Sequence, residues 1–173
     1  MLHMKTGYTS LETYSKYITH INLDYDKAAL REEVEELVFK PFSPPEYYFH
    51  ETWLKARVKH DVIMFPHIEE LHKLFNDSLI VAYRQLADTS VHTHVDPATM
   101  CSINIVLTDD YSPVIFEDYG KINYECALFN TSLRHSVPAY HKERLLLKFA
   151  FKDKSYDDVL NNPNLSSLFL TSS

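Results

Sequence analysis

Two stretches in the first half of the chain repeat apolar residues every three or four positions, which is typical of amphipathic helices. The first follows Asp24 or Asp26, either of which suits a helix N-cap, and a second begins at Pro66. The apolar positions are Leu30, Val34, Leu37 and Val38 in the first and Ile68, Leu71, Leu74 and Phe75 in the second. Residues 1–77 are therefore predicted to be a mostly helical framing segment.

The pattern changes after Asn76-Asp77. Short apolar or alternating runs follow at 79–86, 100–108, 114–117, 124–129, 133–137 and 145–151, separated by turn residues. Six strands with no helix between them predict an antiparallel sandwich or barrel over residues 78–152. A short helix over residues 156–160 and a tail complete the segment 153–173.

Length and composition limit the choice of protein class. A chain of 173 residues fits one domain, with 45% hydrophobic and 24% charged residues. No apolar run is long enough for a membrane span, and residues 1–10 lack the apolar core of a secretory signal, so we expect a cytoplasmic protein. A net charge of −7 argues against nucleic acid as the main partner. The oligomeric state stays open.

Cysteine and glycine are both scarce. Cys101 and Cys126 form neither a disulfide framework nor a paired metal spacing, so we expect buried structural thiols. With two glycines in the whole chain, tight turns have to use Asn, Asp and Pro. The same scarcity excludes a glycine-rich phosphate loop, and there is no nucleophile elbow for a hydrolase.

The triplet His94-Val95-Asp96 and the later His135 are the candidate metal ligands. If His94 ends a strand and Asp96 follows in the loop, both side chains point the same way, since alternate residues share a face. His135, on a later strand, can fold beside them. Two imidazoles and one carboxylate can hold one face of an octahedral Fe(II) and leave three positions open. A His-x-Asp triplet alone is weak evidence, because it also arises by chance.

Arg144 follows His135 by nine residues, at the start of the last predicted strand. We expect this strand to neighbour that of His135, so that the guanidinium projects into the same cavity. A planar, always charged donor suits a bidentate contact with a dicarboxylate such as 2-oxoglutarate.

With these residues the sequence resembles the Fe(II)- and 2-oxoglutarate-dependent oxygenases, over about residues 79–151. His94, Asp96 and His135 match the metal triad of that superfamily, and Arg144 matches the residue that binds the distal carboxylate of 2-oxoglutarate. The segments around His94 and His135 are similar to the aspartyl/asparaginyl β-hydroxylase and prolyl hydroxylase branches. The resemblance implies a mainly β protein with flanking helices around a double-stranded β-helix, a jelly-roll and cupin-like core.

Two departures from that pattern concern the branch. Residues 109–113 and 121–123 stand where members usually have glycine before core strands, although Asn and Asp tolerate left-handed backbone. Aspartyl hydroxylases also typically lack the carboxylate ligand that Asp96 would supply, so that branch does not identify the substrate.

Alternation along the strands predicts further cavity residues. Asn104 shares the more polar face of its strand with Ser102, and the resemblance makes Asn104 a candidate to hydrogen-bond 2-oxoglutarate, with a structural role as the alternative. Tyr83, on the preceding strand, is a second candidate. On the last strand Lys148 shares a face with Arg144 and is the alternative anchor. The opposite face is wholly apolar, so either helices cover it or the register is shifted. That apolar face consists of Leu145, Leu147, Phe149 and Phe151.

The resemblance implies a dioxygenase that hydroxylates a peptide or protein side chain or a small molecule, with Fe(II) and 2-oxoglutarate as cofactors and succinate and CO₂ as products. The alternative is a cupin-like protein that binds a metal or small molecule without oxygenase activity, because His92-Thr93-His94 also has the spacing of cupin ligands. Cupins normally add a Glu shortly afterwards, and none follows here. We therefore expect His92 to lie outside the ligand set.

Overall fold

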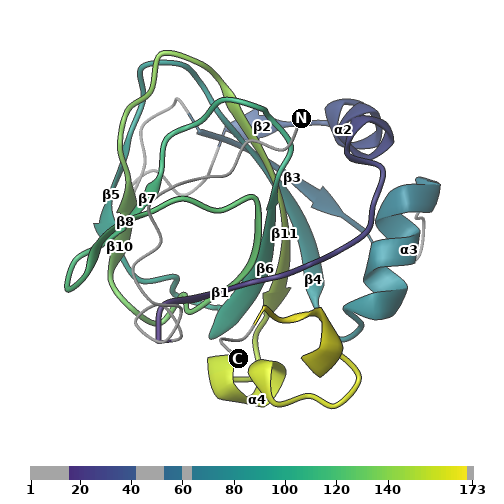
Figure 1. Cartoon of the computed structure of the whole chain (residues 1–173). Helices are drawn as coiled ribbons and strands as arrows, with labels where there is room; N and C mark the ends of the chain where they lie inside the picture. Colours follow the sequence, from purple (N-terminus) through teal and green to yellow (C-terminus); the bar gives the residue numbers. More distant parts are fainter. Residues whose placement is uncertain (1–15, 42–52, 60–63, 171–173) are drawn as a thin grey trace, which may run out of the picture.

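Two antiparallel sheets face each other in the computed structural model, which describes residues 16–41, 53–59 and 64–170 (Figure 1). The larger sheet contains, in spatial order, β1 (Ile18–His20), β9 (Cys126–Phe129), β6 (Cys101–Val106), β11 (Arg144–Phe151), β4 (Leu79–Gln85), β3 (Trp53–Val58) and β2 (Lys40–Pro41). The smaller sheet contains β5 (Val91–His94), β10 (His135–Val137), β7 (Val114–Phe116) and β8 (Gly120–Ile122).

From β4 onward the chain passes back and forth between the two sheets. β4, β6, β9 and β11 lie in the larger sheet, and the strands between them, β5, β7 with β8, and β10, lie in the smaller one. This winding is the double-stranded β-helix, or jelly roll, and it confirms the predicted fold class. The six predicted strands are all present, with β5 and β8 in addition.

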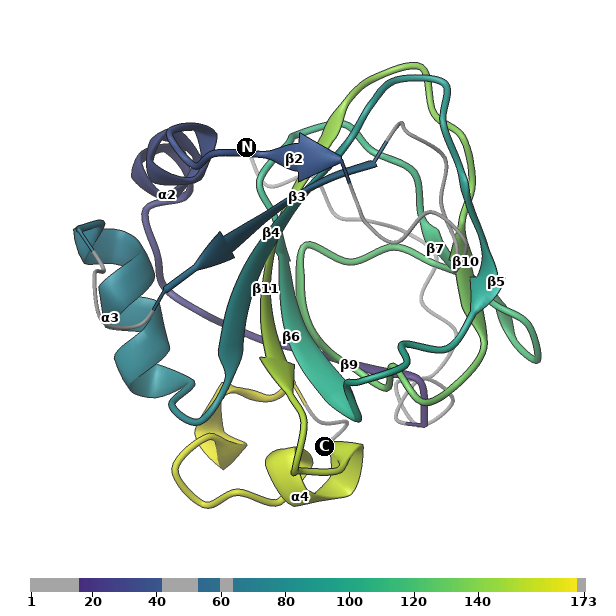
Figure 2. The same cartoon turned by 180° about the vertical axis from the view of Figure 1, so that it is seen from behind.

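The apolar face of β11 packs against a core that helices cover. Leu145, Leu147, Phe149 and Phe151 are buried in one cluster together with residues of α2 (Lys27–Glu35) and α3 (Pro66–Leu74). Both helices lie on the side of the larger sheet away from the smaller sheet (Figure 2). The first of the two alternatives for this strand is therefore correct, and its register needs no shift.

The framing segment is only partly helical. Besides α2 and α3, the described part of residues 1–77 contributes β1, β2 and β3 to the edges of the larger sheet. The longest of these is β3, in which Ala56 and Val58 are buried in the core while Arg57 between them is exposed.

Helix α2 begins where one of the two candidate caps predicts it and ends early. Asp26 is the N-cap, and its carboxylate accepts a hydrogen bond from the backbone N–H of Ala29 at 3.0 Å. The helix ends at Glu35, so Val38 is 76% exposed rather than part of the buried stripe. The predicted C-terminal helix is present as α4 (Tyr156–Leu160), followed by the 3₁₀ helix η2 (Ser166–Leu168).

Aspartates take the place of glycine in two tight turns. Asp77 and Asp88 have φ values of 62° and 60°, in the left-handed region that Asp tolerates better than most residues. Gly120, with φ at 112°, occupies a conformation open to glycine and starts β8. Both cysteines are buried, as predicted, and burial raises the pKa of each thiol to about 12.

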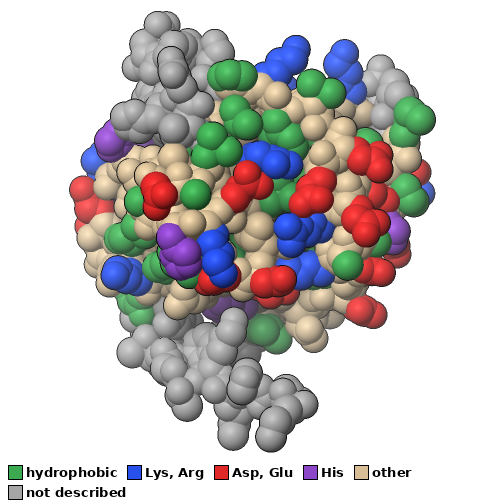
Figure 3. Space-filling model, turned by 90° about the horizontal axis from the view of Figure 1, so that it is seen from above, with side chains coloured by type: hydrophobic (Ala, Val, Ile, Leu, Met, Phe, Trp, Pro, Cys, Tyr) green, Lys and Arg blue, Asp and Glu red, His purple; other side chains and the backbone are tan. Residues whose placement is uncertain are grey.

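Charges of both signs are mixed on the face seen from above in Figure 3. Among the described residues, ion pairs such as Arg84 with Glu143 and Lys142 with Asp110 join opposite charges at 3.2 Å and 2.6 Å. Among the described residues, none of the helices is both long and apolar enough to cross a bilayer.

We predict that Leu147→Ala lowers the free energy of unfolding by about 2–5 kcal/mol, because Leu147 is fully buried in the middle of β11 and its removal leaves a cavity. Urea unfolding measures the change. Val38→Ala, at a position 76% exposed, is the control and should stay within about 0.5 kcal/mol of the wild type. Equal stability of the two variants would contradict the assignment of this face to the core.

Candidate metal centre

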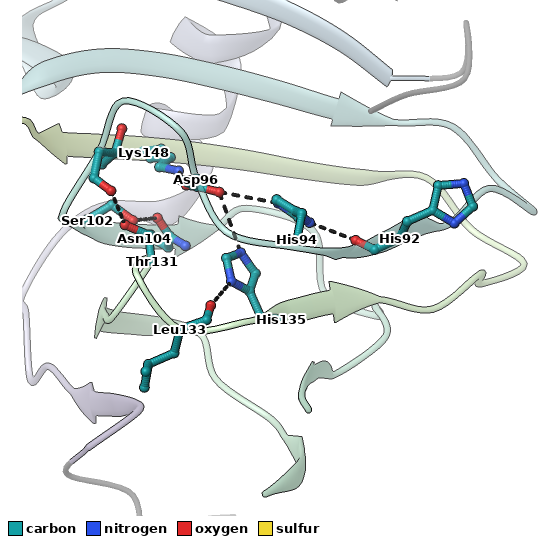
Figure 4. Close-up of polar contacts among 10 residues, drawn as sticks. His92, His94, Asp96, Ser102, Asn104, Thr131, Leu133, His135 and Lys148 are labelled. Carbon is teal, nitrogen blue, oxygen red and sulfur yellow. Dashed lines mark hydrogen bonds and ion pairs between the residues drawn. The ribbon is translucent and has the colours of Figure 1, made fainter. Parts of the chain in front are cut away.

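Neighbouring strands bring the three candidate ligands together. His94 ends β5 and His135 begins β10, and these residues are direct partners in the antiparallel pairing of the two strands. Asp96 follows two residues after His94, outside the strand, as the sequence predicted. One ligand atom from each residue lies within 4.8 Å of the other two. Nε2 of His94 is 3.2 Å from Oδ1 of Asp96, and Nε2 of His135 is 3.6 Å from it (Figure 4).

Backbone carbonyls orient both imidazoles. Nδ1 of His94 lies 2.7 Å from the carbonyl oxygen of His92, and Nδ1 of His135 lies 2.8 Å from that of Leu133. A carbonyl only accepts hydrogen bonds, so each Nδ1 carries the proton and donates it. Nε2 is then the ring nitrogen left for a metal in each imidazole, and both Nε2 atoms face Asp96. A metal-binding imidazole needs this tautomer.

Lys148 holds the second oxygen of Asp96. Its Nζ donates to Oδ2, while Oδ1 of the same carboxylate faces the two imidazoles. Burial alone would raise the pKa of Asp96, but Lys148 and the imidazoles outweigh burial and hold that pKa well below its usual range. Asp96 is therefore ionised, with one oxygen for the ammonium and one directed at the imidazoles.

His135 is a neutral ligand at ordinary pH. Burial lowers the pKa of its ring to about 4, even though Asp96 works in the opposite direction. A neutral imidazole keeps the lone pair that a metal needs. Two imidazoles with one carboxylate form the donor set of a non-haem Fe(II) site, so the residues present fit such an ion.

Arg144 reaches the cavity from the opposite sheet. The expectation that its strand neighbours that of His135 is wrong: β10 pairs with β5 and β7, whereas β11 pairs with β4 and β6. The chain changes sheets between the two strands, which is the rule in this fold. Arg144 nevertheless projects into the predicted cavity, because the two sheets face each other across it.

The guanidinium of Arg144 is buried, with 3% of the residue exposed, and has no acidic partner among the described residues. One NH₂ group donates to the hydroxyl of Tyr124, and the Nε–H has no hydrogen-bond partner in the described part of the chain. The rings of Tyr111 and Tyr124 lie 5.9 Å and 5.5 Å from the guanidinium carbon. A buried cation with an unused donor fits an anionic ligand.

Asn104 and Tyr83 line the same cavity, which has a volume of about 580 Å³ and also contains the triad and Arg144. Oδ1 of Asn104 accepts a hydrogen bond from the hydroxyl of Ser102 at 2.9 Å. The ring of Tyr83 lies 5.6 Å from the ammonium of Lys55 and 5.9 Å from that of Lys148. The predicted faces of these strands are correct, and contact of Asn104 and Tyr83 with a cosubstrate stays a prediction.

Sequence reasoning missed Tyr124 and the partner of Lys148. Alternation along β9 would place Tyr124 on the core face with Cys126 and Leu128, but a bend at Glu125 turns it toward the cavity. The Lys148–Asp96 pair joins two sheets, and spacing along one strand carries no signal for such a contact. The His92 ring points away from Asp96 in Figure 4, and its carbonyl is the part that contributes to the site.

Comparison by sequence finds no matching family model and no matching curated protein. Comparison of the fold finds similar solved structures. A prolyl hydroxylase from Trichoplax adhaerens, solved with a hypoxia inducible factor peptide fragment, is similar with a TM-score of 0.64 and 11% identity, over 88% of this chain and 90% of that one. An oxidoreductase of the 2OG-Fe(II) oxygenase family from Burkholderia pseudomallei has a TM-score of 0.55 and 16% identity, over 86% and 93%.

HygX from Streptomyces hygroscopicus, solved with nickel, 2-oxoglutarate and hygromycin B bound, has a TM-score of 0.56 and 10% identity, over 90% of this chain and 92% of that one. At such low identities, the similarity shows the fold. The chain has a double-stranded β-helix fold, as these oxygenases do.

We predict that Lys148→Met lowers the free energy of unfolding of the metal-free protein by about 3 kcal/mol, because it leaves the Asp96 carboxylate buried without its cation. Adding Mn(II) should restore part of the loss, since a divalent ion replaces the ammonium as counter-charge. Urea unfolding with EDTA and with Mn(II) measures both effects. Lys142→Met breaks an exposed pair with Asp110 and should change little. Wild-type stability of Lys148→Met in EDTA would contradict the prediction.

Proposed function

We propose that the protein is an Fe(II)- and 2-oxoglutarate-dependent dioxygenase that hydroxylates a prime substrate. The observation that carries the proposal is the shared cavity, in which His94, Asp96 and His135 present converging donors and Arg144 presents a buried guanidinium without an acidic partner among the described residues. The fold of 2-oxoglutarate oxygenases, and the nickel and 2-oxoglutarate bound in HygX, support it.

The triad would hold the metal by three donors. His94 and His135 supply Nε2, and Asp96 supplies Oδ1 because its other oxygen is taken by Lys148. The backbone carbonyls of His92 and Leu133 fix the imidazole tautomers before any metal binds. Such preorganisation reduces the cost of ordering the ligands on binding.

Arg144 would bind the distal carboxylate of 2-oxoglutarate. It lies four residues before Lys148 on the cavity face of β11, which is about 13 Å along an extended strand. The Arg144 side chain extends into the cavity from the larger sheet, and the three candidate ligands extend into it from the smaller sheet. Tyr124, already hydrogen-bonded to Arg144, would help hold the carboxylate. Asn104 and Tyr83 line the cavity walls beside this route.

When bound, Fe(II) and 2-oxoglutarate supply the oxidising chemistry: one oxygen atom of O₂ enters a C–H bond of the substrate, and the other enters succinate as CO₂ is lost. The chain would position the reactants and exclude water. The buried guanidinium favours this activity over a cupin-like protein that binds only a metal ion, because such a protein has no use for a second, cationic subsite. Succinate release distinguishes it from a cupin-like protein that binds a small molecule.

His94→Ala and Asp96→Asn should abolish Fe(II) binding, because each removes one of three ligands that converge on the ion. Metal analysis after anaerobic loading and dialysis measures bound iron, and succinate release measures turnover. His92→Ala is the matched control: it removes an adjacent imidazole and keeps the carbonyl that orients His94, so its iron content should equal that of the wild type. Equal iron affinity in all four proteins would refute the metal assignment.

Arg144→Gln should keep Fe(II) and weaken 2-oxoglutarate by about 10- to 100-fold, the effect expected on losing a charge-assisted hydrogen bond. Trp53, the single tryptophan of the chain, lines the cavity, so its fluorescence can report binding to the Mn(II)-loaded protein. The control Arg134→Gln removes an exposed cation that pairs with Glu117 outside the cavity. Unchanged affinity in Arg144→Gln would separate Arg144 from cosubstrate binding.

A further inference from the structure

The cavity gathers positive charge, although the chain carries a net charge of −7. Asp96 is the one carboxylate among the described residues that line it, and Lys148 already pairs with it. Six lining side chains are cationic: Lys55, Arg57, Lys59, Arg144, Lys148 and Lys152. Even with a divalent metal and dianionic 2-oxoglutarate bound, the described lining would therefore keep an excess of positive charge.

These cations occupy both sides of the metal site. Along the cavity face of β11, Arg144 lies four residues before Lys148, and Lys152 lies four residues after it, just beyond the end of the strand. Each interval is about 13 Å of extended chain. In the proposed function, Arg144 binds the cosubstrate on one side of the metal site. Lys152 lies on the other side, which is left for the prime substrate.

Strand β3 adds positive charge level with the metal site and just beyond it. Arg57 on β3 pairs in register with Val81 on β4, which in turn pairs with Lys148 on β11, so Arg57 lies in the same cross-strand row as Lys148. Lys59 follows two residues later. Among the residues that the structure describes, Arg57, Lys59 and Lys152 form no ion pair.

The electrostatic effect of these cations is visible at Lys55, which also lines the cavity. Burial lowers the pKa of Lys55 to about 8, and repulsion from Arg57, Lys148 and Lys152 adds to that effect. Like charges that line one cavity raise its electrostatic energy when it is empty, and an anion bound among them would lower it.

We infer that the prime substrate carries an acidic group, a carboxylate or a phosphate, which binds between Arg57, in the same cross-strand row as Lys148, and Lys152, on the side of the metal site away from Arg144. That the bound anion is the prime substrate rests on the proposed function. The anion site itself rests only on the charges that line the cavity. Arg57 offers a planar fork and Lys152 a point charge, and both suit either acid. A neutral substrate would leave their repulsion uncompensated.

The test uses the full chain loaded with Mn(II) and saturating 2-oxoglutarate in the absence of oxygen, at constant ionic strength. Inorganic phosphate, N-acetylaspartate and the neutral isostere N-acetylasparagine are titrated separately, with calorimetry as the readout. The phosphate and carboxylate arms distinguish the two acids. The double variant Arg57→Gln/Lys152→Gln is compared with Lys40→Gln/Lys121→Gln, which removes two exposed cations that do not line the cavity.

We expect at least one acid to bind the wild type more tightly than N-acetylasparagine, and to bind the cavity variant at least about tenfold more weakly. The control variant should match the wild type. Equal binding of acids and neutral isostere, or equal affinity in the cavity and control variants, would overturn the inference.

Failure of the proposed function has a different signature. Mn(II) and 2-oxoglutarate binding are measured first, and their absence would reject the oxygenase assignment. The same acid titrations on the metal-free protein would then still decide whether Arg57 and Lys152 bind an anion, because the cavity and control variants differ only in where the two charges are lost.

Discussion

The strict alternation of β11 is the constraint on which the rest of the structure depends. Its odd-numbered side chains, from Leu145 to Phe151, pack into the core under α2 and α3. Its even-numbered ones place Arg144 and Lys148 in the cavity. A slip of one residue would put both cations into the core and expose the apolar face, so the hydrophobic effect that stabilises the sheet also fixes the position of the cations.

The pair between Lys148 and Asp96 links the two sheets at the candidate metal centre. The carboxylate comes from just beyond β5 of the smaller sheet and the ammonium from β11 of the larger one. A buried carboxylate needs a positive partner, and Lys148 provides one. The same contact directs a single oxygen of Asp96 toward the imidazoles, so Asp96 would supply one donor to a metal held there.

Local patterns made much of this structure predictable. Alternation and turn residues located the six strands, and the His94, Asp96 and His135 spacing located a cluster that the structure brings together. Spacing along the chain carries no information about contacts between the two sheets. It therefore predicted that the strand of Arg144 pairs with that of His135, which is wrong, and it did not predict that Lys148 pairs with Asp96. Bends broke the pattern elsewhere, since the bend at Glu125 turns Tyr124 into the cavity.

Both imidazoles are oriented by the peptide carbonyl two residues before them, at His92 and Leu133. A carbonyl is present whatever side chain its residue bears, so mutations in the walls of the cavity leave the ring tautomers intact. Substitutions could therefore change the shape and charge of the cavity while the two imidazoles keep their orientation.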